Sequence, residues 1–152
     1  MFVNGKVADI TYTQNSYNLF YDAFKDLKTN HPEVKNIIID ESINTGGDCT
    51  TLIELAGFFM GDVTVSLKNK LNNEVYKVTY KVDTNYDGVY DDSDYQAKGY
   101  KVYDLISTVS FSCGNFLPTI LKQNQAATII GQTSSGGSCI VGPNASSQGD
   151  IY

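Results

Sequence analysis

The sequence predicts an α/β fold built around a largely parallel sheet, and three observations support this prediction. Short apolar runs alternate along the chain with segments of helical periodicity, as parallel strands and their crossover helices require. The segment 34–40 carries three consecutive isoleucines, which is typical of a strand covered on both faces. The chain has 152 residues, of which 41% are hydrophobic and 18% charged, so we expect one globular domain over residues 1–152.

The first elements form a βαβ unit. Residues 2–11 mix Val, Ile and Phe with one Gly and predict a strand or a short hairpin. From Ser16 onward aromatic residues and Leu27 recur at helical spacing, with charged residues on the opposite face. Pro32 ends this helix, and the apolar run 34–40 is the next strand.

The remaining segments continue this alternation. They predict a helix at about 50–60, strands at 62–67 and 75–82 with a polar turn between them, a strand at 101–106, a helix at 115–123 and a buried strand at 127–132. Serine and glycine dominate from Thr133 onward, so irregular chain is expected there. In such sheets, ligand sites lie in the loops beyond the carboxyl ends of the strands.

The charge balance excludes one class of partner. The chain has 17 Asp and Glu against 11 Lys, no Arg, and a net charge of −6. A nucleic-acid binder needs clustered Lys and Arg, so no nucleic-acid partner is expected. No window approaches the roughly 20 apolar residues of a membrane span, and the first residues lack the pattern of a signal peptide. Because the chain opens on strand-like sequence, we expect a piece of a longer protein.

The first candidate site segment, 40–47 (DESINTGG), joins a strand to a helix. Gly46 and Gly47 would expose backbone N–H groups that can hold an anion or a developing oxyanion, because glycine allows close approach to a ligand. A flexible turn without a function has the same composition and is the alternative interpretation.

The second candidate segment, 110–115 (SFSCGN), places Ser112 at the start of a helix after a strand. Nucleophiles are often presented there, and the N–H of the next residue, Cys113, can join an oxyanion hole. The alternative role for Ser112 is a helix cap. The Cys113 thiol has no base or cation nearby in sequence, so we expect it to be packing rather than a nucleophile.

Together these segments resemble the C-terminal-processing, or tail-specific, serine peptidases. IIIDESINTGGD is similar to the D-L-R-x-N-x-G-G signature of that family, FSCGN to its Ser-x-x-Glu nucleophile segment, and ATIIGQTSSGG to its G-x-x-T-x-G turn. FYDAFKDLKTNHPEVKN matches the helix before the signature, so the resemblance covers most of residues 2–142. It implies a Clp-protease/crotonase-like core with Ser112 as nucleophile. The oxyanion hole would be formed by the N–H of Gly46 or Gly47 together with that of Cys113.

The sequence departs from the family pattern at three positions. The family arginine is Ser42, the glutamate after the nucleophile is Asn115, and the lysine that many members use as general base falls at Gly137. A Ser-Lys dyad at that position is therefore excluded, and the chain is more similar to the tricorn-core-like branch, which takes a histidine from an upstream segment. The only histidine, His31, is expected at a helix end away from the site, so the base is expected to be missing from this chain.

The acidic segment 83–94 has the spacing of a twelve-residue calcium loop. Gly88 occupies the turn position, and the oxygen donors are Asp83, Asn85, Asp87, the Val89 carbonyl, Asp91 and Asp94. The final Asp resembles dockerin-like loops. Since strands flank the segment, we expect an inserted β-hairpin that a structural Ca²⁺ stabilises. A solvated acidic hairpin tip is the alternative. Without this loop the chain is nearly neutral.

The leading functional hypothesis is a serine endopeptidase core that hydrolyses peptide bonds through an acyl-enzyme at Ser112. Its partner would be a peptide or protein substrate, and the family and the calcium loop favour an extracytoplasmic or secreted location. A non-catalytic binding or scaffold domain is the alternative, and a crotonase-like acyl-CoA enzyme is a distant third. Cys49 and Cys139 flank the two glycine-rich turns, with their pairing left open. The sequence favours no particular oligomeric state.

Overall fold

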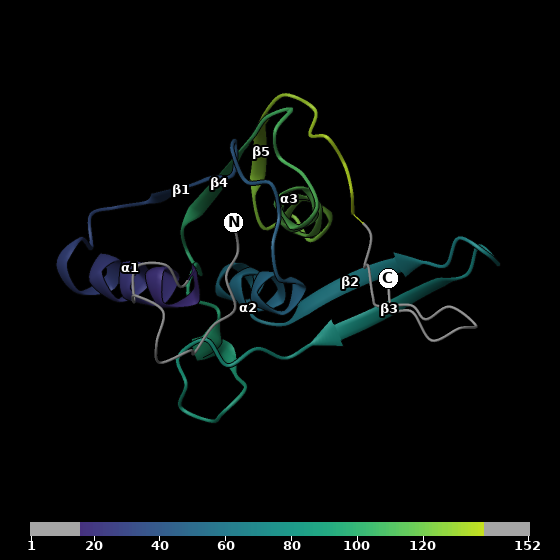
Figure 1. The fold of residues 1–152 in the computed structure, drawn as a ribbon. Helices are drawn as coiled ribbons and strands as arrows, with labels where there is room; N and C mark the ends of the chain where they lie inside the picture. Colours follow the sequence, from purple (N-terminus) through teal and green to yellow (C-terminus); the bar gives the residue numbers. More distant parts are fainter. Residues whose placement is uncertain (1–15, 139–152) are drawn as a thin grey trace, which may run out of the picture.

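The computed structural model describes residues 16–138, and its elements follow the predicted order (Figure 1). The strand predicted at 2–11 and the tail from residue 139 lie outside the described residues. The elements are α1 (Ser16–Asn30), β1 (Asn36–Asp40), α2 (Cys49–Met60), β2 (Val63–Lys68), β3 (Val75–Tyr80), the 3₁₀ turn η2 (Asp92–Asp94), β4 (Lys101–Ile106), α3 (Cys113–Gln123) and β5 (Thr128–Gly131).

The parallel sheet has the strand order β1-β4-β5, which confirms the α/β class. β4 is the central strand: its Asp104 lies opposite Ile39 of β1 on one side and Ile129 of β5 on the other. β1 and β4 are neighbours although α2, the β2–β3 hairpin and the acidic segment lie between them in sequence. The loops after the three strands therefore meet at one edge of the sheet.

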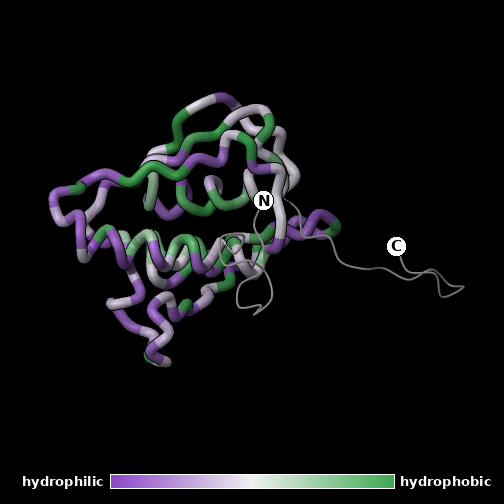
Figure 2. The backbone as a smooth tube through the Cα atoms, turned by 60° about the vertical axis from the view of Figure 1, so that its left-hand side comes forward, coloured by the Kyte–Doolittle hydropathy of each residue, from purple (hydrophilic) through white to green (hydrophobic). Residues whose placement is uncertain are grey.

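The interior is formed by one face of this sheet and the three helices. In Figure 2 the hydrophobic stretches of the backbone gather in these elements, and hydrophilic stretches mark the outer loops. Aromatic rings of α1 pack on α2, with Phe24 stacked on Phe58 at a centroid distance of 5.4 Å. Fully buried apolar side chains come from α2 and α3: Leu52, Leu55, Phe58, Phe59, Leu117, Ile120 and Leu121. The amphipathic pattern of α1 is confirmed, since Tyr17 and Phe24 are its buried residues.

The prediction that the strands are covered on both faces is wrong for the described residues. Ile39 is buried, whereas Ile38, which points to the opposite face, is 65% exposed. Ile130 of β5 is also exposed, so the strand predicted at 127–132 is present but not buried. The physical reason is that the described helices cover only the face that carries Ile39.

The predicted hairpin is confirmed, but the acidic segment does not form its tip. β2 and β3 pair antiparallel from Val63↔Tyr80 to Lys68↔Val75, and a turn over 69–74 joins them. The acidic segment 83–94 follows β3 and leads through η2 toward β4, which belongs to the other sheet (Figure 1). After the acidic segment the chain packs against α2 again, where the Ala97 N–H donates a hydrogen bond to the Phe58 carbonyl at 2.8 Å.

Within residues 16–138, no helix has the length and apolar character that crossing a bilayer requires.

Candidate active site

The loops after β1, β4 and β5 are joined by backbone hydrogen bonds. The Phe111 N–H donates to the Asn44 carbonyl at 3.0 Å, and the Ser112 N–H donates to the Gly136 carbonyl at 2.9 Å. Phe111 and Gly136 form a parallel bridge that extends the sheet beyond its strands. The two candidate segments and the glycine-rich turn after β5 are thus brought together, as the position of loops in parallel sheets predicts.

Ser112 has a strained backbone. Its φ of 54° and ψ of −121° are rare for a residue with a side chain, and such conformations cost about 1–3 kcal/mol. Ser112 occupies the position before α3, but its side chain makes no capping hydrogen bond to the helix. The structure therefore does not support the helix-cap role. A strained strand-to-helix turn is how α/β hydrolases expose their nucleophile.

Gly46 packs directly against Ser112. A Cβ at residue 46 would lie 2.7 Å from the Ser112 Cβ and 3.1 Å from its Oγ, and the φ of Gly46 is +113°. Gly114, in the first turn of α3, is equally tight, because its Cβ would lie 2.2 Å from the Asn44 carbonyl oxygen. Both positions need glycine because Ser112 lies so close to residue 46 and the Asn44 backbone so close to residue 114, which a merely flexible turn does not require.

The amide of Gly46 is already engaged. Its N–H donates to the Asn44 Oδ1 at 3.0 Å, so Gly46 contributes close packing rather than a free oxyanion donor. Of the two alternatives for the glycine donor, this hydrogen bond favours Gly47 over Gly46, and the oxyanion role itself stays a prediction. Cys113 is the first residue of α3, where amides have no acceptor within the helix. The next amide, that of Gly114, donates to the Phe111 carbonyl instead.

The turn after β5 closes over the same loop. A Cβ at Gly137 would lie 2.5 Å from the Phe111 ring, so a lysine at this position would not fit without a shift. Asn115, where the family has glutamate, is hydrogen-bonded through its side chain to Ser134 and Ser138. The packing around Gly137 is therefore consistent with a glycine, rather than a lysine, at this position.

The sequence model of peptidase family S41 matches residues 6–151. The chain belongs to peptidase family S41. Three solved structures share its fold. The photosystem II D1 C-terminal processing protease is 16% identical, with a TM-score of 0.64, over 91% of this chain and 31% of that protein. A lipoprotein from Streptococcus agalactiae is 16% identical, with a TM-score of 0.60, over 97% and 56% of the two chains.

The third structure, a putative S41 protease from Bacteroides fragilis NCTC 9343, is also 16% identical, with a TM-score of 0.56, over 93% of this chain and 36% of that one. The present chain thus spans between about a third and just over half of the length of these relatives. No curated protein matches it significantly.

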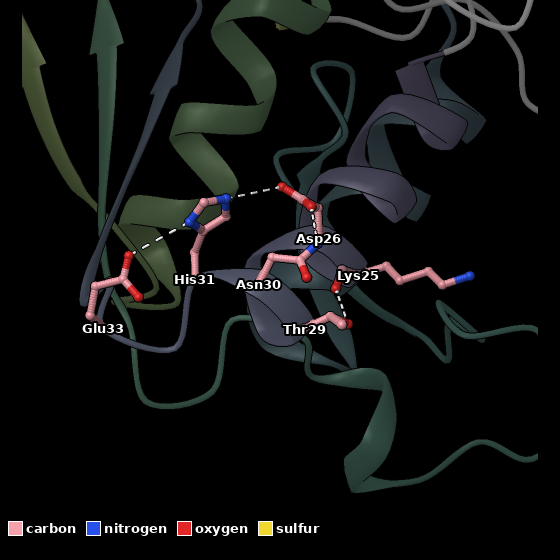
Figure 3. A network of polar contacts seen from close by, with 6 residues as sticks. All are labelled: Lys25, Asp26, Thr29, Asn30, His31 and Glu33. Carbon is pink, nitrogen blue, oxygen red and sulfur yellow. Dashed lines mark hydrogen bonds and ion pairs between the residues drawn. The ribbon is translucent and has the colours of Figure 1, made fainter.

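His31 lies away from this S41 site, as the sequence predicts. It follows α1 and precedes β1, whereas Ser112 lies beyond the opposite ends of the strands. Figure 3 shows its ring between two carboxylates, with Nε2 3.6 Å from Asp26 and Nδ1 3.6 Å from Glu33. His31 is half exposed, and both of its ion-pair partners lie outside residues 110–115, the serine loop. Within residues 16–138, the S41 site therefore contains no imidazole.

The Cys113 thiol faces inward from the loop that carries Ser112. Its Sγ lies 3.4 Å from the Sγ of Cys49, and it donates to the Gly47 carbonyl at 3.2 Å. Burial and the neighbouring Cys49 thiol raise the pKa of Cys113 to about 12. A thiolate nucleophile at Cys113 is therefore disfavoured, in agreement with the sequence. Cys139 lies outside the described residues, so its pairing with Cys49 stays an open prediction.

Sequence reasoning missed a pair of buried acids beneath the site. Glu41 and Asp104 are 2% and 0% exposed, and both lie on the inward face of the sheet, next to Ile39. The two carboxyl groups lie next to each other, and Glu41 Oε2 and both carboxyl oxygens of Asp104 have no hydrogen-bond partner outside the pair. Burial, reinforced by repulsion from Asp104, raises the pKa of Glu41 to about 9, and burial raises the pKa of Asp104 to about 7. The pair therefore holds protons that exposed acids release.

Glu41 connects this pair to the serine loop. Its Oε1 accepts a hydrogen bond from the Asn44 Nδ2 at 2.9 Å, and its carbonyl accepts one from the Ser110 hydroxyl at 2.8 Å. Asn44 in turn holds Gly46 and Phe111. The signal available in the sequence was the period-two alternation of the strands, which places residues 39, 41 and 104 on one face once the register is known.

The acidic segment adopts a loop in which side chains accept from backbone N–H groups. The Asp83 Oδ2 accepts from the Gly88 N–H at 3.0 Å, and the Asp94 Oδ1 accepts from the Thr84 N–H at 2.8 Å. The other Asp83 oxygen is buried without a partner. Across residues 16–138, no three Asp, Glu, His or Cys side chains converge as metal ligands do. Calcium binding by this segment therefore stays a prediction.

Proposed function

We propose that this chain is the catalytic core of an S41 serine endopeptidase that cleaves peptide bonds through an acyl-enzyme at Ser112. The observation that carries the proposal is the strained, non-capping backbone of Ser112 held against Gly46. Strained backbone of this kind occurs at active sites, where it exposes a serine Oγ to the substrate carbonyl. The amides of Gly47 and Cys113 would then stabilise the oxyanion that forms on that carbonyl.

The mechanism needs a proton acceptor for the Ser112 hydroxyl, because an un-ionised serine is a weak nucleophile. We assign this role to a histidine supplied from outside this sequence, whose one histidine is His31. The tricorn-core-like branch that the sequence resembles takes its histidine from an upstream segment. The base would take the Oγ proton during attack and return it to the leaving amine. The substrate is a peptide or protein, and the location we propose is extracytoplasmic. A lipoprotein among the structural neighbours agrees with that location.

Covalent labelling tests this function. A fluorophosphonate probe incubated with the full-length protein is expected to modify the tryptic peptide that contains Ser112, as seen by mass spectrometry. Ser112→Ala should remove the label, because alanine has no hydroxyl group that can attack the probe. Ser66→Ala, on the exposed side of β2, is the matched control and should label like the wild type.

Two outcomes would contradict the proposal. A folded wild-type protein that gives no adduct would identify the chain as the non-catalytic binding or scaffold domain. An adduct that persists in Ser112→Ala would place the reactive group elsewhere.

We further propose that the segment 83–94 binds a structural Ca²⁺. The support is the alternating donor pattern together with the buried, unpartnered Oδ1 of Asp83, since a carboxylate oxygen without a partner is costly unless a cation compensates it. The Oδ1 of Asp91, another oxygen donor of the pattern, accepts a hydrogen bond from the Ser93 N–H. Such loops outside cells bind with dissociation constants of about 0.1–1 mM.

Thermal melting with 10 mM CaCl₂ tests the loop. Binding at the affinity above stabilises the fold by about 1.4–2.7 kcal/mol, so the melting temperature should rise by several degrees. Asp83→Asn should abolish the rise, whereas Asp62→Asn, an exposed acid outside the loop, should keep it. An equal response of both variants, or no response of the wild type, would leave the loop as a solvated acidic connection.

A further inference from the structure

The first residues of α2 and α3 place two thiols against each other beneath the serine loop. Cys49 begins α2 and Cys113 begins α3, and their Sγ atoms are 3.4 Å apart. Cys49 is partly exposed, whereas Cys113 is 2% exposed. On its other side, the Cys113 Sγ donates to the carbonyl of Gly47. The Cys49 sulfur therefore contacts the Cys113 sulfur, which in turn contacts the glycine turn at Gly47.

We propose that Cys49 and Cys113 form a reversible disulfide when the protein meets a small-molecule disulfide such as oxidised glutathione, and that this bond lowers the reactivity of Ser112. The first half of the proposal, the disulfide, is independent of the enzymatic role. The second half, the effect on Ser112, rests on the proposed function.

The reaction proceeds by two thiol–disulfide exchanges. Cys49, the accessible thiol, loses its proton and attacks one sulfur of oxidised glutathione, which releases one glutathione thiol and leaves a mixed disulfide on Cys49. The Cys113 sulfur then loses its proton and attacks the Cys49 Sγ, which releases the second glutathione. Two protein thiols are oxidised and one glutathione disulfide is reduced to two thiols, so atoms and electrons balance.

The distances favour the second step. A disulfide joins its sulfurs at about 2.05 Å, so the two Sγ atoms need to approach by roughly 1.4 Å. Because Cys113 already contacts Cys49, its attack is intramolecular and has a high effective concentration. The raised pKa of Cys113 slows this attack, so we expect closure within minutes to hours rather than seconds.

Closure changes the glycine turn. Cys113 loses the S–H that donates to the Gly47 carbonyl, and its backbone, which follows Ser112 directly, is drawn toward α2. Gly46 and Ser112 have no spare space between them, because even a methyl group at residue 46 would overlap the Ser112 Cβ. A displacement at Gly47 or Cys113 is therefore transmitted to the nucleophile and to the two amides proposed for the oxyanion.

Peptide mapping tests the disulfide. The full chain is equilibrated overnight at pH 8 with oxidised or reduced glutathione, free thiols are alkylated, and the digest is analysed without reduction. We expect a cross-linked peptide pair joining Cys49 to Cys113 in the oxidised sample, and its loss after dithiothreitol. Cys139→Ser should keep this pair, and Cys49→Ser should abolish it. Cross-links that use Cys139 instead, or free Cys49 and Cys113 in the oxidised protein, would overturn the proposal.

Labelling rates test the effect on Ser112. The oxidised protein is expected to react with the fluorophosphonate at least about 10-fold more slowly than the reduced protein, and dithiothreitol should restore the rate. Cys49→Ser should react at the same rate in both buffers. Equal rates for both forms of a cross-linked wild type would overturn the regulatory half. If neither form labels, the proposed function fails with that half, and the peptide map still decides the disulfide.

Discussion

Replacing Gly46 with alanine is expected to slow the reaction of Ser112 with a fluorophosphonate by about 100-fold or more. The new Cβ would lie 2.7 Å from the Ser112 Cβ, so one of the two residues must move. A misplacement of about 1 Å in a reacting group costs on the order of 100-fold in rate. Residue 46 would also keep a φ of +113°, which strains any side chain.

Gly99→Ala is the matched control for this variant. Gly99 has a φ of +91°, but a Cβ there meets no atom within 4 Å, so the substitution carries the backbone strain without the contact. Second-order labelling rates should therefore fall in Gly46→Ala and stay near wild type in Gly99→Ala, with circular dichroism confirming that both are folded. A folded Gly46→Ala protein that labels at the wild-type rate would show that the Gly46 contact does not position Ser112.

The buried pair of Glu41 and Asp104 is expected to make the protein more stable at pH 5 than at pH 8. In the folded state both pKa values are raised, whereas the unfolded chain has the ordinary values of 4.5 and 3.8. Between pH 5 and 8, unfolding therefore releases protons, and the free energy of unfolding falls as the pH rises. The slope is up to about 1.4 kcal/mol per pH unit for each proton released.

Urea unfolding from pH 5 to 8 measures this slope. The stabilising contribution is complete below the unfolded pKa values and is lost as the pH rises through the raised pKa values of the pair, about 7 and about 9. The double variant Glu41→Gln and Asp104→Asn should flatten the profile, because neither group can then ionise. Asp40 and Asp91 have lowered pKa values and stay ionised across this range, so they add no slope.

Exposed acids give the control for the pH profile. Glu74→Gln changes a charge on the hairpin turn and should leave the slope as in the wild type. A wild-type protein whose stability rises from pH 5 to 8, or a double variant with an unchanged slope, would show that the pair does not retain its protons.

Local periodicity was enough to locate most elements. α1 begins at Ser16 as predicted, and β4 occupies 101–106, because a helical or alternating pattern is carried by neighbouring residues alone. The sequence predicts that the acidic segment forms a hairpin tip, which is wrong because nothing in the neighbouring residues shows that β3 and β4 belong to different sheets. The exposed face with Ile38 was missed for a related reason: an apolar run does not show what packs on it.

The sequence predicts which residues belong to the candidate site, but it does not predict how they are arranged. Motif order and the family resemblance predict Ser112, Gly46, Gly47 and Cys113 as site residues. The backbone strain of Ser112 depends on hydrogen bonds from distant loops, so no local pattern encodes it. The pairing of Glu41 with Asp104 depends on the register of β1 against β4 across some sixty residues of intervening chain, which a sequence without the sheet order does not supply.

The dependence of Ser112 on three separate loops has a consequence for the order of events during synthesis. Its amide is held by the Gly136 carbonyl, and the residue before it is held by Asn44. Parallel pairings of this kind form late in folding, because the chain between them must first be closed into a loop. A nascent chain that already carries Ser112 therefore cannot hold this residue in its strained conformation until residue 136 has left the ribosome and can pair with it.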